Sequence, residues 1–201
     1  MHSDQKIIVI GASTGGIEAL RMVLRGLERG INAVVCVCQH MDRFARLDYR
    51  MVFSDVFDFH LTEVEDKQWL SPGNIFFAPP GYHLYVEEQG YFGLSLDAPV
   101  NWSRPSIDVL FESAARVYRD RVIGVVLTGA NADGAQGIRE IKRLGGTTIA
   151  QDPSLAVAST MPRLAIETGC VDHVLRLEEI APRLMSLASL QGPLLNDIGA
   201  I

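Results

Sequence analysis

Ser13 is a candidate nucleophile because of the residues around it. It lies in the sequence GASTGG at 11–16, which matches the G-x-S-x-G pattern between an apolar run and a segment of helical period. Glycines beside a serine allow a sharp strand-to-helix turn that exposes the hydroxyl, and the helix start supplies backbone N–H groups for developing negative charge. The pattern therefore predicts a nucleophilic serine, with the Thr14 N–H as one donor of an oxyanion hole.

His40 and Asp133 follow two further apolar runs, 33–38 and 121–127. In open α/β sheets, ligands bind outside the carboxyl ends of the strands, so residues that follow three strands meet at one edge. A histidine there can take a proton from a serine, and a carboxylate can orient that histidine. The three positions predict a hydrolase triad in which Ser13 is the nucleophile, His40 the base and Asp133 the acid.

Simpler interpretations remain open for each of these residues. Ser13 could cap a helix or lie in a phosphate-binding loop, His40 could be a structural histidine, and Asp133 could be a helix N-cap. A dinucleotide site is disfavoured, because Ser13 replaces the middle glycine of its fingerprint and His40 stands where an acidic ribose ligand is expected. Asp152 is a rival acid, although Pro153 after it favours a turn.

The other histidines and the cysteines are weaker candidates for chemistry. No comparable loop surrounds His2, His60, His83 or His173. Three cysteines cannot all pair, and two of them alternate on one strand without a second pair of zinc ligands, so we expect reduced packing residues at Cys36, Cys38 and Cys170. The sequence thus predicts neither a metal nor a cofactor.

The elements that must position the triad follow from hydrophobic periodicity. Continuous apolar runs alternate with helical patterns at both ends of the chain, whereas the middle has short strands separated by turn residues. We expect an α/β fold with three layers, a doubly wound, mostly parallel sheet and an antiparallel hairpin region. The expected strands are 6–10, 33–38, 121–127 and 147–150, with a meander of 74–78, 82–86 and 91–96. The expected helices are 17–27, 106–118, 138–144, 164–168 and 178–187. Gly30 is expected to stop the first helix, and Ser106 is expected to cap the second.

Composition limits the remaining function classes. The chain has 201 residues, of which 48% are hydrophobic and 21% charged, which predicts a single domain over 1–201 with a core at about 6–188 and a loose tail at 189–201. A net charge of -6 without any Lys/Arg cluster disfavours nucleic-acid binding and a basic membrane-surface role. No signal peptide or membrane span is visible, so a cytoplasmic protein is expected.

Taken in order, several motifs resemble one family. They are GASTGG at 11–16, QHM at 39–41, RPSID at 104–108, LTG at 127–129 with Asp133-Gly134, AQDP at 150–153 and MPRLAI at 161–166. Together they resemble the catalytic domain of the CheB-type chemotaxis protein-glutamate methylesterases, from about Lys6 to Leu187. The resemblance implies a serine hydrolase that removes methyl groups from glutamates of chemoreceptor cytoplasmic helices, and many members also deamidate glutamines there.

Residues 129–131 depart from the family pattern. Gly-Ala-Asn replaces the usual Gly-Met-Gly, and Asp42 stands where proline is common. By resemblance, the Ala130 N–H is the second oxyanion donor, and Asn131 tolerates a left-handed turn better than other non-glycine residues. This departure motivates an alternative function, in which a catalytically impaired relative docks a receptor or signalling partner.

The family usually has an N-terminal receiver domain, and we expect none here because the first apolar run begins almost at Met1. We therefore expect an open pocket that does not respond to small phosphodonors, and control through a receiver or adaptor protein in trans. Labelling by a serine-directed fluorophosphonate would separate the enzyme from the docking relative and from a phosphate-binding module.

Overall fold

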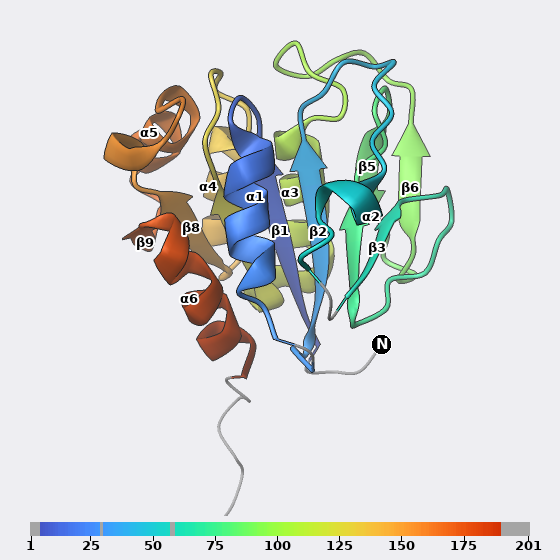
Figure 1. Cartoon of the computed structure of the whole chain (residues 1–201), viewed down its shortest axis with the longest axis horizontal. Helices are drawn as coiled ribbons and strands as arrows, with labels where there is room; N and C mark the ends of the chain where they lie inside the picture. The colour runs from blue at the N-terminus through green and yellow to red at the C-terminus, as the bar shows by residue number, and fades with distance from the viewer. Residues whose placement is uncertain (1–4, 29, 57–58, 190–201) are drawn as a thin grey trace, which may run out of the picture.

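A computed structural model of the chain describes residues 5–28, 30–56 and 59–189 (Figure 1). The strands are β1 (Lys6–Ala12), β2 (Ala33–Gln39), β3 (His60–Glu63), β4 (Asn74–Phe77), β5 (His83–Val86), β6 (Phe92–Ser95), β7 (Val122–Val126), β8 (Thr147–Gln151) and β9 (His173–Leu175). Seven of them form one sheet in the order β3-β4-β2-β1-β7-β8-β9, with every neighbouring pair parallel. β5 and β6 form a separate antiparallel hairpin. The expected fold class is confirmed.

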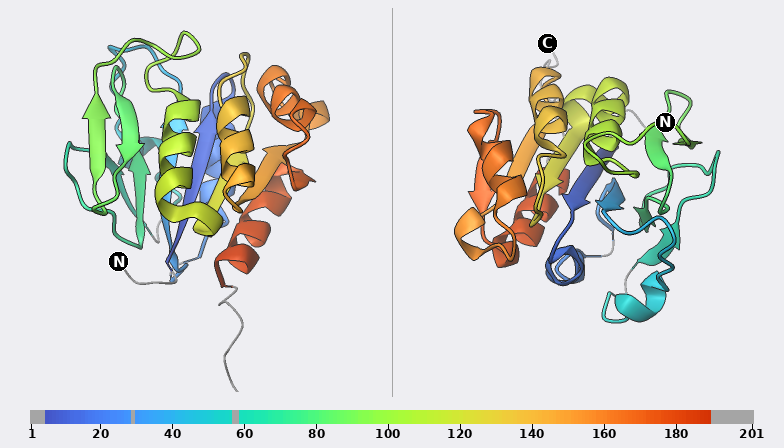
Figure 2. Two further views of the ribbon diagram at one scale, coloured as in Figure 1. Left: turned by 180° about the vertical axis from the view of Figure 1, so that it is seen from behind. Right: turned by 90° about the horizontal axis from the view of Figure 1, so that it is seen from above.

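The helices cover both faces of this sheet. They are α1 (Gly16–Arg25), α2 (Tyr49–Val52), α3 (Ile107–Tyr118), α4 (Ala135–Arg143), α5 (Thr160–Glu167) and α6 (Leu177–Ser189), with short 3-10 turns at η1 (Arg119–Arg121) and η2 (Pro153–Leu155). α1 and α6 lie on the face that is nearest the viewer in Figure 1. α3 and α4 lie on the opposite face, which the left view of Figure 2 shows, and α5 packs beside α4.

The alternation along β1 explains its unbroken apolar sequence. Ile8 and Ile10 pack against α1 and α6, whereas Ile7 and Val9 pack under α3 and α4. Because helices cover both faces, every side chain of the strand enters a core, as is usual for parallel sheets. Cys36 and Cys38 are buried on the α3 side, in agreement with their predicted packing role.

β1 lies at the switch point of the sheet. From β1 the chain passes through α1 to β2 on one side, and later returns through α3 on the other face to β7, on the other side of β1. Ligands of doubly wound sheets bind where the strand order reverses, outside the carboxyl ends of the strands. Ser13 directly follows β1, so the topology places it at that crevice.

Two local predictions were wrong. The segment 74–78 does not belong to an antiparallel meander, because β4 pairs in parallel with both β2 and β3. Its side chains enter both cores, Ile75 and Phe77 on one face and Phe76 on the other, which is the environment of a central parallel strand. α1 ends at Arg25 with Gly26 as its C-cap, so Gly30 lies beyond the helix. The short strands β3 and β9 were not predicted as elements.

The assignment of 1–201 to one domain stays a prediction. Residues 190–201, which make up nearly all of the predicted tail, lie outside the described residues. Among the helices of the described ranges, none combines the length and the apolar character that crossing a membrane requires.

Candidate active site

The Ser13 turn connects β1 to α1 in three residues. Gly15 has φ +77, and a Cβ there would lie 2.6 Å from Val157 Cβ, so both conformation and space require glycine. A Cβ at Gly16 would overlap the side chain of Gln39. The Gln39 side chain lies in that space, and its Nε2 donates to the carbonyl oxygens of Ser13 and His40, each at 2.9 Å. The glycines therefore fix the turn against the end of β2.

Strand register places His40 level with Ser13. Ala12 pairs with Gln39 in the parallel ladder, so the next residue of each strand is a member of the predicted triad. The His40 N–H donates to the Ala12 carbonyl at 2.9 Å, and the Ser13 N–H donates to the Thr128 carbonyl at 3.0 Å. The backbone ladder thus continues past the strand ends and holds the three segments together.

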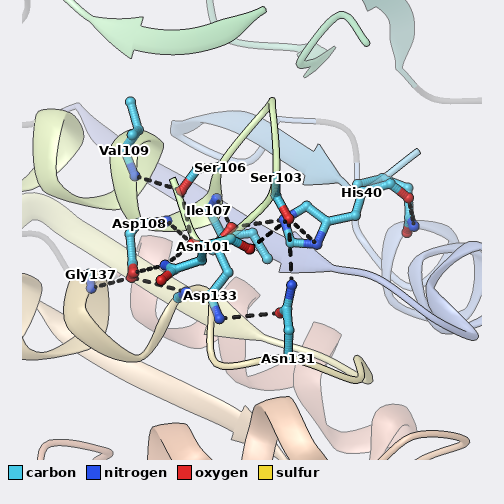
Figure 3. A network of polar contacts seen from close by, with 12 residues as sticks. His40, Asn101, Ser103, Ser106, Ile107, Asp108, Val109, Asn131, Asp133 and Gly137 are labelled. Atoms are coloured by element: carbon cyan, nitrogen blue, oxygen red, sulfur yellow. Dashed lines mark hydrogen bonds and ion pairs between the residues drawn. The ribbon is translucent and has the colours of Figure 1, made fainter. Parts of the chain in front are cut away.

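His40 and Asp133 form a direct pair, which Figure 3 shows. His40 Nε2 lies 2.8 Å from Asp133 Oδ2, and the Asp133 side chain is completely buried while 11% of the His40 side chain is exposed. The predicted base and acid, 93 residues apart in the sequence, are therefore in contact.

Asp133 is surrounded by hydrogen-bond donors. Burial raises its pKa, but donors that stabilise the charged form, led by His40 and Asn101, outweigh burial and lower the pKa below its ordinary value. Oδ1 accepts from Asn101 Nδ2, Ser106 Oγ and Asp108 N–H, while Oδ2 accepts from His40 and the Ile107 N–H. An ionised acceptor keeps the hydrogen on His40 Nε2, so Nδ1 of the neutral ring carries no hydrogen and can act as a base.

Among the described residues, the hydroxyl that forms a hydrogen bond with His40 Nδ1 is that of Ser103. Its Oγ lies 3.5 Å from His40 Nδ1 and 3.4 Å from Asn131 Nδ2. In the described part of the chain, no hydrogen bond joins the Ser13 hydroxyl to His40. The structure thus joins two of the three predicted residues, and the role of Ser13 stays a prediction.

The predicted oxyanion donors lie in two neighbouring loops. Thr14 and Ala130 are exposed, and neither N–H has an acceptor within residues 5–28, 30–56 and 59–189. Thr128 braces these loops: its Oγ1 donates to the Thr14 carbonyl at 2.8 Å and accepts the Ala158 N–H at 2.8 Å. Unpaired N–H groups beside a candidate nucleophile are available to an oxyanion, and this assignment also stays a prediction.

The weaker candidates have structural contacts. Asp152 accepts from the Ser154 N–H at 2.8 Å and from the Ser154 hydroxyl at 2.7 Å, as predicted for a turn residue. His83 is buried between the Ala98 carbonyl and the Ser106 N–H. His60 lies on β3 and His173 on β9 beside an arginine, while His2 lies outside the described residues. Asp133 does not cap α4, which follows it in sequence; its carboxylate accepts the N–H groups of Ile107 and Asp108 in the first turn of α3.

Sequence reasoning missed three residues of this network, Asn101, Ser103 and Asp108. Asp108 was noticed only as part of the RPSID motif, without a role. Asn101 carried no signal that distinguishes it from any loop asparagine. Its φ of 50 and the φ of 62 at Trp102 place two consecutive residues in the left-handed region, and no local pattern predicts this.

A cavity of about 330 Å³ opens beside His40. Its walls are residues 40–43 on one side and Pro99 with residues 102–105 on the other. Trp102 at its rim is fully exposed. A reacting group that enters this cavity can reach the imidazole.

Comparisons with known proteins show the family and the fold. A family model described as CheB methylesterase matches residues 8–184. A relative from Leptospira interrogans serogroup Icterohaemorrhagiae serovar copenhageni is 43% identical over 184 residues, which cover 92% of this chain and 95% of the relative. A protein-glutamate methylesterase/protein-glutamine glutaminase of Bordetella parapertussis is 38% identical over 188 residues, and here the match covers 92% of this chain but only 53% of the relative.

The fold has a counterpart in the crystal structure of the Thermotoga maritima CheB methylesterase catalytic domain. The TM-score is 0.88 at 34% sequence identity, and the match covers 91% of this chain and 98% of that one. The chain therefore spans nearly the whole of one relative and of one catalytic domain, and about half of the longer relative.

Proposed function

We propose that this chain, which belongs to the CheB methylesterase family, is a serine hydrolase that removes methyl esters from glutamate side chains of chemoreceptor cytoplasmic helices. The observation that carries the proposal is the His40–Asp133 pair, seated level with the Ser13 turn at the switch point of the sheet. The names of the longer relatives, protein-glutamate methylesterase/protein-glutamine glutaminase, supply the substrate class.

The proposed reaction is acyl transfer to Ser13 followed by hydrolysis. Ser13 Oγ attacks the side-chain carbonyl carbon of the ester while His40 Nδ1 takes the hydroxyl proton. The Thr14 and Ala130 N–H groups receive the oxyanion, and Asp133 stabilises the imidazolium. The imidazolium then returns the proton to the leaving methoxide, so methanol departs and a glutamyl ester of Ser13 remains.

Water completes the cycle by the reverse use of the same groups. His40 removes a proton from water, the hydroxide attacks the acyl carbon, and the proton passes to Ser13 Oγ as the glutamate leaves. A glutamine substrate follows the same path with ammonia as the first leaving group, so deamidation requires no further residue. Release of methanol from methylated receptor cytoplasmic fragments tests the proposal.

A fluorophosphonate is expected to label Ser13 and not Ser103. Both serines lie near His40, but Ser13 lies in a strand-to-helix turn beside N–H groups that have no acceptor among the described residues and can stabilise a phosphoryl oxygen. Mass spectrometry of the labelled peptide separates the two, because they lie in different tryptic fragments. Labelling that persists in Ser13→Ala and disappears in Ser103→Ala would show that Ser103 is the nucleophile.

Ala130→Pro is expected to lower kcat by about a hundred- to a thousandfold, the usual effect of losing one oxyanion donor. Proline removes the N–H and adds no polar group, and that N–H has no acceptor within the described ranges, so little stability should be lost. Steady-state kinetics and thermal unfolding measure the two effects. Ala130→Gly, which keeps the N–H, is the matched control, and an equal loss in both variants would argue against an oxyanion role.

A further inference from the structure

Two carboxylates at this site accept backbone N–H groups at the starts of α3 and α4 (Figure 3). Asp108, in the first turn of α3, accepts on Oδ1 from the N–H groups of Gly134 at 2.9 Å and Gly137 at 2.7 Å, at the start of α4. Asp133, just before α4, accepts the N–H groups of Ile107 at 2.7 Å and Asp108 at 3.0 Å, at the start of α3. The exchange ties the two helix starts together, so a displacement of either carboxylate displaces the other.

Asn101 joins the two carboxylates from outside both helices. Its Nδ2 donates to Asp108 Oδ2 at 2.7 Å and to Asp133 Oδ1 at 3.0 Å. Both partners are acceptors, so the amide nitrogen and not the amide oxygen must face them. Asn101 adopts φ 50, a left-handed conformation that asparagine tolerates better than most residues. The loop therefore delivers one donor group to two buried acids.

The Asn101 amide influences the charge of both carboxyl groups, Asp108 and Asp133. Burial, together with the charge of Asp133, raises the pKa of Asp108 to about 6, while the pKa of Asp133 is held below its ordinary value. An amide that donates to both groups favours their charged forms, and so do the starts of two helices. Without the amide, both carboxyl groups would take up a proton at higher pH, and a proton on Asp133 would remove the acceptor of His40 Nε2.

We propose that Asn101 and Asp108 are positioning residues for the catalytic acid. Asn101 holds Asp133 Oδ1, so that Oδ2 stays directed at His40, and Asp108 holds both the Asn101 amide and the start of α4. In the described part of the chain, no hydrogen bond joins either side chain to His40, so both act through Asp133. The inference rests on the proposed function, in which Asp133 is the acid of the triad.

The first test is Asn101→Ala, with Val100→Ala as the matched control in the same loop. The Val100 backbone pairs with Ser103 through groups that the substitution keeps. We expect Asn101→Ala to lower kcat by about ten- to a hundredfold, the usual range for a hydrogen bond to a charged group. KM should not change, and the acid limb of the kcat profile should move to higher pH. A loop residue with a merely structural role would not move that limb.

A double variant tests the connection to Asp108. Asp108→Asn keeps an oxygen for the Gly134 and Gly137 N–H groups, but it presents an amide to Asn101 where a carboxylate oxygen stood. We expect the kcat loss of the double variant with Asn101→Ala to be clearly smaller than the product of the two single losses, because both disrupt one contact. Fully multiplicative losses would overturn the connection.

A measurement without turnover separates this inference from the proposed function. The proton on His40 Nε2 can be followed by proton NMR, and its resonance should move in Asn101→Ala and stay in place in Val100→Ala. If the wild-type protein releases no methanol, the proposed function fails, and the resonance alone then decides whether Asn101 holds the pair. An unchanged resonance, together with wild-type kcat and acid limb, would overturn the inference.

Discussion

Ser13→Ala is expected to reduce methanol release from a methylated receptor fragment by about three to six powers of ten, as the loss of a triad nucleophile usually does. Alanine cannot form the acyl intermediate, and only the oxyanion donors and the binding surface remain. The substitution should leave folding intact, because the glycines and backbone hydrogen bonds define the turn and the hydroxyl does not.

Ser186→Ala, an exposed serine on α6, is the matched control and should retain wild-type turnover. Thermal unfolding should show the same Tm for both variants and the wild type. Near-normal methanol release by a folded Ser13→Ala protein would refute the assignment. In that case Ser103, the hydroxyl that lies 3.5 Å from His40 Nδ1, becomes the first residue to examine.

Asp133→Asn is expected to lower kcat by about four powers of ten, as in other triads that carry this substitution. The carboxylate accepts from donors on both oxygens, whereas an asparagine has only one acceptor oxygen. If that oxygen serves the start of α3, the new NH₂ group faces His40 Nε2. The ring must then carry its hydrogen on Nδ1, and the nitrogen that should act as base is blocked.

The same variant should change the pH dependence of stability. The folded-state pKa of Asp133 lies below its unfolded value, so its contribution to stability is complete above the unfolded value and is lost as pH falls through the folded one. Thermal unfolding at decreasing pH should show this loss in the wild type and a weaker loss in Asp133→Asn.

For the loss of turnover, the control is Asp152→Asn, which removes the other candidate acid. Loss of turnover in Asp152→Asn, together with unchanged turnover in Asp133→Asn, would show that Asp152 and not Asp133 is the acid of the triad.

The sequence by itself determined the parts that depend on local pattern. An apolar run, a glycine-rich turn and a helical period over about twenty residues predict the strand, the Ser13 turn and α1, because each signal lies within one element. His40 could be placed for a related reason. It follows a second apolar run, and parallel strands joined by a short helix lie close together with their ends at one edge.

Only the tertiary structure decided how the carboxylate is held. Asp133 had a candidate role as a cap of the helix that follows it, but its carboxylate instead accepts N–H groups of the first turn of α3, from residues 25 and 26 positions away in the sequence. Asn101 reaches it from a loop, in a backbone conformation that no local pattern requires. Such contacts depend on how α3 and α4 pack on one face of the sheet, and that packing is set by the whole core.

The pairing of β4 also could not be predicted from local sequence. Its short apolar sequence is followed by turn residues, so it is compatible with a hairpin or with a parallel sheet. The choice depends on what covers its two faces, and residues from distant segments bury Ile75 and Phe77 on one side and Phe76 on the other. Local sequence thus determined which residues could do chemistry, while long-range packing decided which groups orient them, because burial and hydrogen-bond partners are properties of the assembled core.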